Sequence, residues 1–136
     1  MKLENVNVAV ANPYDVIIDN DLIKNAGHHL EDLVQQRKVM IVTDENVASY
    51  GYLGTLQEAI SPITTDVNTI TLPAGEAQKS SANYIRLQEE LATLNYSRSD
   101  VLIALGGGVI GDLVGFTAAT YLRGIPYIQI PTTLLS

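Results

Sequence analysis

The sequence contains no cysteine, and its 136 residues hold only eight lysines and arginines against fifteen aspartates and glutamates. Without cysteine the chain has no disulfide, no thiolate metal site and no cysteine nucleophile. The formal charge of −7 leaves no basic surface for a nucleic-acid backbone or an anionic membrane, so neither is an expected partner. An anionic ligand must therefore be held by backbone N–H groups at a helix start and by a few local cations.

Long apolar runs are also missing, since none approaches the roughly 18 residues needed to span a bilayer. The first ten residues lack the basic-then-apolar pattern of a signal peptide. We therefore expect a cytoplasmic protein. The length suits one domain, and a hydrophobic content of 46% is that of an ordinary globular protein.

Hydrophobic periodicity predicts strands and helices in alternation along the chain. The expected strands lie at 6–10, 14–19, 39–43, 67–72, 101–105 and 127–130, and the expected helices at about 20–38, 80–95 and 107–122. Repeated strand-helix units with short connections predict an α/β fold, a Rossmann-like open and mostly parallel sheet with helices on both faces. Thr132 and Thr133 are suited to cap a further helix.

A glycine-rich segment follows the strand at 101–105. Gly106, Gly108 and Gly111 satisfy the spacing G-x-G-x-x-G between a predicted strand and a predicted helix, which is the context of a dinucleotide site. Glycine allows backbone N–H groups to approach a pyrophosphate at the helix start. The alternative is that small residues only allow this apolar helix to pack closely on the sheet.

One expected feature of such a site is missing. The acidic residue that binds the ribose hydroxyls about 20 positions after the glycines is replaced by a strand and Pro-Thr-Thr. The acid must come from elsewhere in the chain. Asp44, at the end of an earlier strand, and Glu76 are the candidates.

Three segments carry a resemblance to a known family. The run ALGGGVIGDLVGFTAATYLRGIPYIQIPTTLL resembles the signature of 3-dehydroquinate synthases, and the segments PAGEAQKS and TDENV are similar to that family in the same order. The resemblance implies that the chain, residues 1–136, is the family's N-terminal NAD-binding domain. The positions that match its NAD contacts and glycine turn are Asp44, Asn46, Glu76, Lys79, Gly106, Gly107, Gly108, Val109, Gly111, Asp112, Thr132 and Thr133.

Each of these positions also has a plain structural alternative. Asp44 and Asn46 could cap the helix after their strand, Asp112 could complement the helix dipole, and Glu76 with Lys79 could form an exposed ion pair. Arg123 resembles the family's substrate-binding arginine, although an arginine there could also complement a helix C-terminus.

The resemblance implies a complete reaction as well. The family converts 3-deoxy-D-arabino-heptulosonate 7-phosphate, a sugar phosphate, into 3-dehydroquinate and phosphate in the shikimate pathway, with catalytic NAD and a divalent metal such as zinc or cobalt. Its metal ligands, a glutamate and two histidines, belong to a C-terminal helical domain. We expect this chain to end before that domain, to provide no catalytic residue or metal ligand, to lack activity alone, and to belong to a homodimeric enzyme.

Two kinds of rival remain. Another sugar-phosphate cyclase, such as a 2-deoxy-scyllo-inosose synthase, or an iron-dependent polyol dehydrogenase would share the fold and the glycine-rich NAD turn. The other rival is a domain that binds NAD, or only keeps the fold, without chemistry of its own.

Overall fold

The computed structural model describes residues 4–8, 14–18 and 23–132. The strands are β1 (Glu4–Val8), β2 (Tyr14–Ile18), β3 (Lys38–Asp44), β4 (Asp66–Leu72), β5 (Val101–Gly106) and β6 (Tyr127–Pro131). The α-helices are α1 (Ala26–Val34), α2 (Glu45–Ser49), α3 (Tyr52–Ile60), α4 (Ser81–Thr93) and α5 (Gly108–Thr120). Two short 3-10 helices complete the set, η1 (Glu76–Gln78) and η2 (Tyr121–Arg123).

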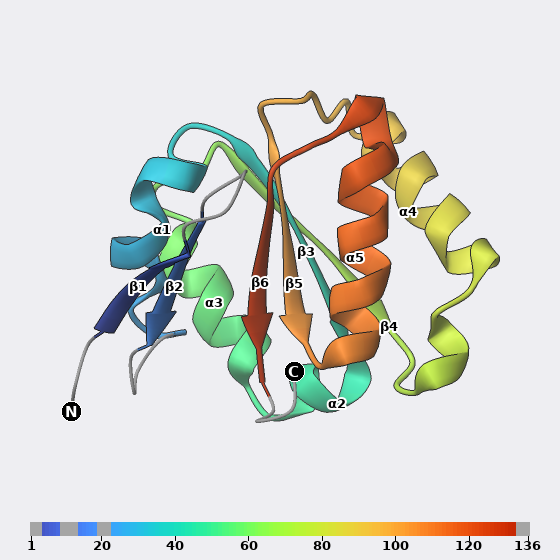
Figure 1. The fold of residues 1–136 in the computed structure, drawn as a ribbon, viewed down its shortest axis with the longest axis horizontal. Helices are drawn as coiled ribbons and strands as arrows, with labels where there is room; N and C mark the ends of the chain where they lie inside the picture. Colours follow the sequence, from blue (N-terminus) through green and yellow to red (C-terminus); the bar gives the residue numbers. More distant parts are fainter. Residues whose placement is uncertain (1–3, 9–13, 19–22, 133–136) are drawn as a thin grey trace.

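Four strands form one parallel sheet in the order β4-β3-β5-β6, and β1 pairs with β2 in a separate antiparallel hairpin (Figure 1). All four parallel strands point the same way, so the sheet has a carboxyl edge, where Asp44, Leu72, Gly106 and Pro131 end the strands. The opposite edge, where these strands begin, is called the amino edge below. This arrangement confirms the predicted α/β fold with a parallel sheet.

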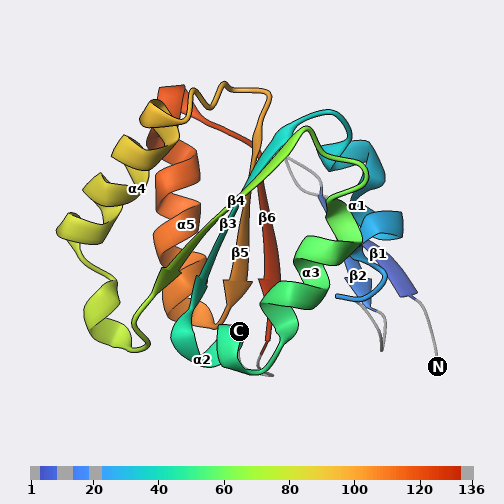
Figure 2. The same ribbon diagram turned by 180° about the vertical axis from the view of Figure 1, so that it is seen from behind.

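Helices cover both faces of the sheet, α4 and α5 on one side and α1 and α3 on the other (Figures 1 and 2). Side chains of β3 alternate between the two faces. Met40 and Val42 join the core under α4 and α5, while Val39 and Ile41 join the core under α1 and α3. A strand buried on both faces requires a continuous apolar run, which explains why β3 and β5 were readable from the sequence.

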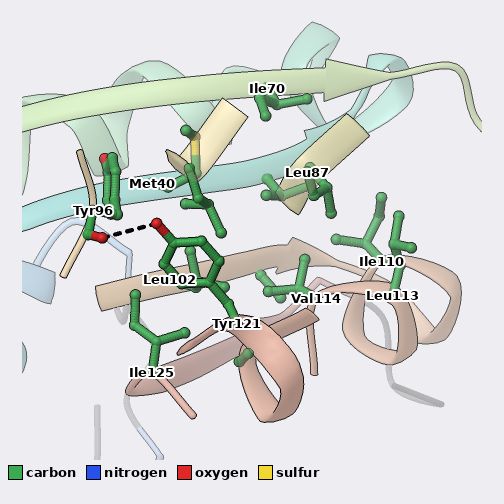
Figure 3. Packing of buried hydrophobic residues seen from close by; sticks show 14 of the residues in the cluster. Met40, Ile70, Leu87, Tyr96, Leu102, Ile110, Leu113, Val114, Tyr121 and Ile125 are labelled. Carbon is green, nitrogen blue, oxygen red and sulfur yellow. Dashed lines mark hydrogen bonds between the residues drawn. The ribbon is translucent and has the colours of Figure 1, made fainter. Parts of the chain in front are cut away.

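The core under α4 and α5 extends to the amino edge through two tyrosines (Figure 3). The Tyr121 hydroxyl donates a 2.8 Å hydrogen bond to the Tyr96 carbonyl oxygen, and both residues are buried. Tyr96 also receives a 2.8 Å hydrogen bond on its own hydroxyl from the Asn68 amide. The polar ends of these rings are therefore satisfied inside an otherwise apolar layer.

The structure differs from the expected elements in two places. The helix expected at about 20–38 is α1, which ends at Val34 because Gln36 adopts a left-handed φ of 58° and its N–H bonds to the Ile63 carbonyl instead. The helix α3 was not expected, and α2 is the helix that the capping alternative for Asp44 and Asn46 implied. Asp44 caps α2, and Leu56 and Ile60 of α3 recur at helical spacing and are fully buried. Positions 9–10, 19–22 and 133–136 lie outside the described residues.

Candidate functional site

The start of α5 lies at the middle of the carboxyl edge, directly after β5. Its N-cap, Gly107, has no side chain to accept the first N–H groups. By contrast, Asp44 accepts from Val47 N at the start of α2, at 2.9 Å, and Ser80 caps α4. The N–H groups of the first turn of α5 lack such a side-chain acceptor, which is the property that a polyanion site requires.

Gly108 and Gly111 of this turn differ in what surrounds the position of a side chain. A Cβ added to Gly108 would meet no atom within 4 Å, so packing of the chain itself does not require glycine there. A Cβ on Gly111 would collide with the Gln129 side chain of β6, and the Tyr127 hydroxyl lies 3.1 Å from the Gly111 carbonyl oxygen. Gly111 therefore lies against the end of the flexible Gln129 side chain, whereas the open space at Gly108 suits the approach of a ligand.

Lys79 joins the segment after β4 to the first turn of α5. Its ammonium lies 3.1 Å from Asp112 Oδ2 and 3.6 Å from Glu76 Oε1. The hydrogen bond and charge of Asp112, and then the charge of Glu76, raise the pKa of Lys79 above its ordinary value. A groove of about 380 Å³ is lined by this ion pair and by Tyr84 of α4 and Phe116 of α5, whose rings contact each other. The three predicted residues therefore form one exposed cluster beside the turn.

The remaining predicted positions approach the same edge from β3 and β6. Asp44 ends β3 next to β5, and its Oδ1 caps α2, as one of the alternatives proposed. Asn46 is exposed in the first turn of α2. The Thr132 N–H donates to the Gly106 carbonyl oxygen at 3.3 Å, which holds the end of β6 against the turn. Thr133 lies outside the described residues.

Arg123 is separated from this group. It lies in η2, after the C-terminal end of α5 and at the amino edge (Figure 1). A helix of 13 residues is about 20 Å long, so the Arg123 backbone is about that distance from the glycine turn. The structure thus brings the predicted dinucleotide residues together at one edge and leaves the predicted substrate residue at the other.

Sequence reasoning missed two sets of residues that support these positions. Tyr127 and Gln129 lie two residues apart in β6, on the same face of the strand, and both contact Gly111. Their spacing of two in a predicted strand was the signal that could have identified them. Burial, and then the charge of Asp112, raise the pKa of Tyr127. Asp100, which accepts a hydrogen bond from Ser97 N, is the second residue that the sequence analysis did not identify. A serine three residues before an aspartate in a polar turn is a common signal for such local hydrogen bonding.

The described residues contain no group of three or more histidines, cysteines or acids that could hold a metal ion. None of their helices combines the length and the apolar character that crossing a membrane would require.

Comparison with known proteins places these features in a family. A family model described as 3-dehydroquinate synthase N-terminal matches residues 69–136. The 3-dehydroquinate synthase of Latilactobacillus sakei subsp. sakei (strain 23K) is 45% identical over 123 residues, which are 90% of this chain and 34% of that protein. The chain spans about a third of the length of the curated relatives it matches.

Two solved structures share the fold. A 2-deoxy-scyllo-inosose synthase superposes with a TM-score of 0.83 at 20% identity, over 97% of this chain and 36% of that one. A 2-epi-5-epi-valiolone synthase from Streptomyces hygroscopicus subsp. jinggangensis 5008, solved with NAD⁺ and Zn²⁺ bound, has a TM-score of 0.77 at 28% identity over 95% and 35% of the two chains. With half of its residues matched by the family model, this chain belongs to the 3-dehydroquinate synthase family.

Proposed function

We propose that residues 1–136 are the NAD-binding domain of a 3-dehydroquinate synthase, an enzyme that converts 3-deoxy-D-arabino-heptulosonate 7-phosphate into 3-dehydroquinate and phosphate. The observation that carries the proposal is the uncapped, glycine-lined start of α5 at the carboxyl edge, surrounded by the residues that match the family's NAD contacts. Parallel α/β sheets bind their ligands at this edge. Relatives named for this reaction support the substrate class.

Each part of the cluster has a role in holding NAD. The N–H groups of Gly107, Gly108 and Val109 bind the pyrophosphate, which the helix dipole favours in a chain of net charge −7. Asp44 uses the oxygen that is not engaged in capping α2 to accept a ribose hydroxyl. Glu76 and Lys79 bind ribose hydroxyls, and Lys79 keeps Asp112 neutralised near the incoming phosphates.

NAD would supply reversible hydride removal at a ring hydroxyl of the substrate, which acidifies the neighbouring C–H and permits loss of phosphate. The chain's own contribution is to orient the two ligands and to keep the cofactor fixed between the two hydride transfers. Zinc or cobalt is proposed for the complete enzyme, with its ligands outside these 136 residues. A cytoplasmic setting remains a prediction from the sequence.

The position of Arg123 bears on the oligomeric state. The Arg123 backbone lies about 20 Å from the turn, at the opposite end of α5, which separates it from ligands bound over the turn on the same chain. We infer that Arg123 reaches the substrate held by a second copy, which makes the proposed homodimer necessary for the reaction. The guanidinium would hold the substrate's carboxylate or phosphate through paired N–H groups.

The test measures NAD binding by calorimetry and phosphate release by the complete enzyme. Gly108→Val should weaken NAD binding at least about tenfold, because the added side chain occupies the space left for the pyrophosphate. Gly54→Val is the matched control, since a Cβ there also meets no atom within 4 Å and Gly54 lies in α3. Equal NAD affinity in the wild type and Gly108→Val would remove the turn from the site.

The reaction itself is tested with the heptulosonate phosphate and, in parallel, with other sugar phosphates. Phosphate release only from the heptulosonate phosphate supports the proposed reaction. Turnover only of another sugar phosphate would assign the chain to a different cyclase that shares the fold.

A further inference from the structure

A depression of about 1080 Å³ opens on the amino edge, at the opposite side of the sheet from the glycine turn. It is lined by small residues of α5, namely Gly115, Ala118 and Ala119, and by two arginines, Arg98 and Arg123. The chain has only eight lysines and arginines in total. Two guanidinium groups around one hollow, in a chain of net charge −7, are therefore an unusual concentration of positive charge.

Neither arginine forms an ion pair with another residue in the described part of the chain. Lys79, in comparison, is engaged by Glu76 and Asp112, and the Lys38 ammonium donates to the carbonyl oxygens that end α4, including Leu94 O at 2.6 Å. The donors of Arg98 and Arg123 are left to solvent or to a ligand. Each guanidinium carries five donors in a fixed plane, which matches the oxygens of a phosphate or a carboxylate.

The turn that carries Arg98 is fixed by a buried carboxylate. Asp100 is 8% exposed, and its Oδ2 accepts from Ser97 N at 2.8 Å and from Ser97 Oγ at 3.1 Å. Its Oδ1 accepts from Lys38 N at 3.0 Å, which ties the turn to the first residue of β3. The backbone on both sides of Arg98 is thus held before any ligand arrives.

The turn that carries Arg123 is fixed as well and is strained. Leu122 and Arg123 have left-handed φ angles of 49° and 67°, and the turn is closed by a 2.8 Å hydrogen bond from Gly124 N to Tyr121 O. Such angles are uncommon for residues other than glycine, asparagine and aspartate, and they persist where the surroundings enforce them. The Tyr121 hydroxyl bonds to Tyr96 O, next to the Arg98 turn, so the two turns are connected (Figure 3).

We propose that Arg98 and Arg123 together form an oxyanion site, and that Arg98 is a second substrate-binding residue beside Arg123. The ligand is the phosphate or carboxylate group of the substrate that a second copy holds. Pairing two guanidiniums around one oxyanion gives more affinity and a more defined orientation than one cation provides. The identity of the ligand rests on the proposed function, whereas the presence of an oxyanion site at the amino edge does not.

The first experiment titrates the 136-residue chain with inorganic phosphate at constant ionic strength and follows backbone amide signals by NMR. Phosphate should shift the signals of residues 97–100 and 121–124. Arg98→Gln should weaken phosphate binding at least about fivefold, because a charge-assisted pair is removed. Arg86→Gln is the matched control, since Arg86 is an exposed arginine of α4 that does not line the depression, and it should bind phosphate as the wild type does.

Equal phosphate affinity in Arg98→Gln and Arg86→Gln would overturn the proposal, as would signal shifts confined to residues 106–111. A parallel titration with acetate tells whether the site accepts a carboxylate or prefers a phosphate, since binding at the same residues supports the oxyanion site in either case. An NAD titration of Arg98→Gln separates the two proposals. NAD should bind to this variant as to the wild type, and a wild type that binds phosphate at the arginines but no NAD would reject only the proposed function.

Discussion

The two edges of the parallel sheet are built in opposite ways. At the carboxyl edge, the helix start of α5 has no side-chain cap and the ion pair of Lys79 with Asp112 is exposed. At the amino edge, Asp100 and Tyr121 are buried, and their polar side-chain atoms form hydrogen bonds within the chain. Groups that must stay available to a ligand therefore contribute little to stability, while the groups that position a binding side chain form all their hydrogen bonds within the chain.

The largest expected effect is on the amino edge. Asp100→Ala leaves the N–H groups of Lys38 and Ser97 without their acceptor in a partly buried turn, and we expect the free energy of unfolding to fall by about 1–3 kcal/mol. Urea denaturation measures the loss. Asp112→Ala, at the carboxyl edge, removes a side chain that is 65% exposed and should leave the stability nearly unchanged. Equal losses in the two variants would show that the two edges contribute alike to stability.

A smaller effect concerns alkaline pH. Burial raises the pKa of Tyr96 to about 12, against an ordinary value of 10.0. A folded-state pKa above the unfolded value means that the contribution to stability is fully present below pH 10 and is lost as the pH rises to about 12. Urea midpoints measured across this window should fall more steeply for the wild type than for Tyr96→Phe, which has no hydroxyl to ionise. Parallel pH profiles would show that the Tyr96 hydroxyl does not titrate with folding.

The smallest expected effect on stability lies at the carboxyl edge. Lys79→Met breaks the exposed pairs with Asp112 and Glu76, and the thermal midpoint should not change measurably. NAD affinity, by contrast, should fall several-fold because Asp112 is then unneutralised next to the pyrophosphate. Calorimetry with NAD and a melting curve on the same sample give both values. A large drop in the midpoint with unchanged NAD affinity would reverse the roles of the two edges.

Some parts of the fold and site were predictable from the sequence because one local pattern determined them. The apolar runs of β3 and β5 and the glycines after β5 are of this kind, since burial on both faces and a tight turn leave clear marks. The end of α1 was not predictable in this way, because the Gln36 N–H leaves the helical pattern and bonds to the carbonyl oxygen of Ile63, a residue distant in the sequence. The separation of Arg123 from the glycine turn was also predictable, because the apolar run between them indicated one helix with the turn at its start and the arginine at its end.

The order of strands in the sheet has a consequence for biosynthesis. On one side, β3 pairs with β4, where Lys38 lies opposite Asp66. On its other side, β3 pairs with β5, where Val39 lies opposite Val101, so that side pairs only with residues synthesised much later. Strands that pair across long stretches of sequence form slowly, because the intervening chain must first be ordered. As the nascent chain emerges, β3 and β4 are therefore exposed on one side until β5 is available. The glycine turn, which follows β5 directly, then forms only after β3 and β4 have emerged, and NAD can stabilise only chains that have already completed the centre of the sheet.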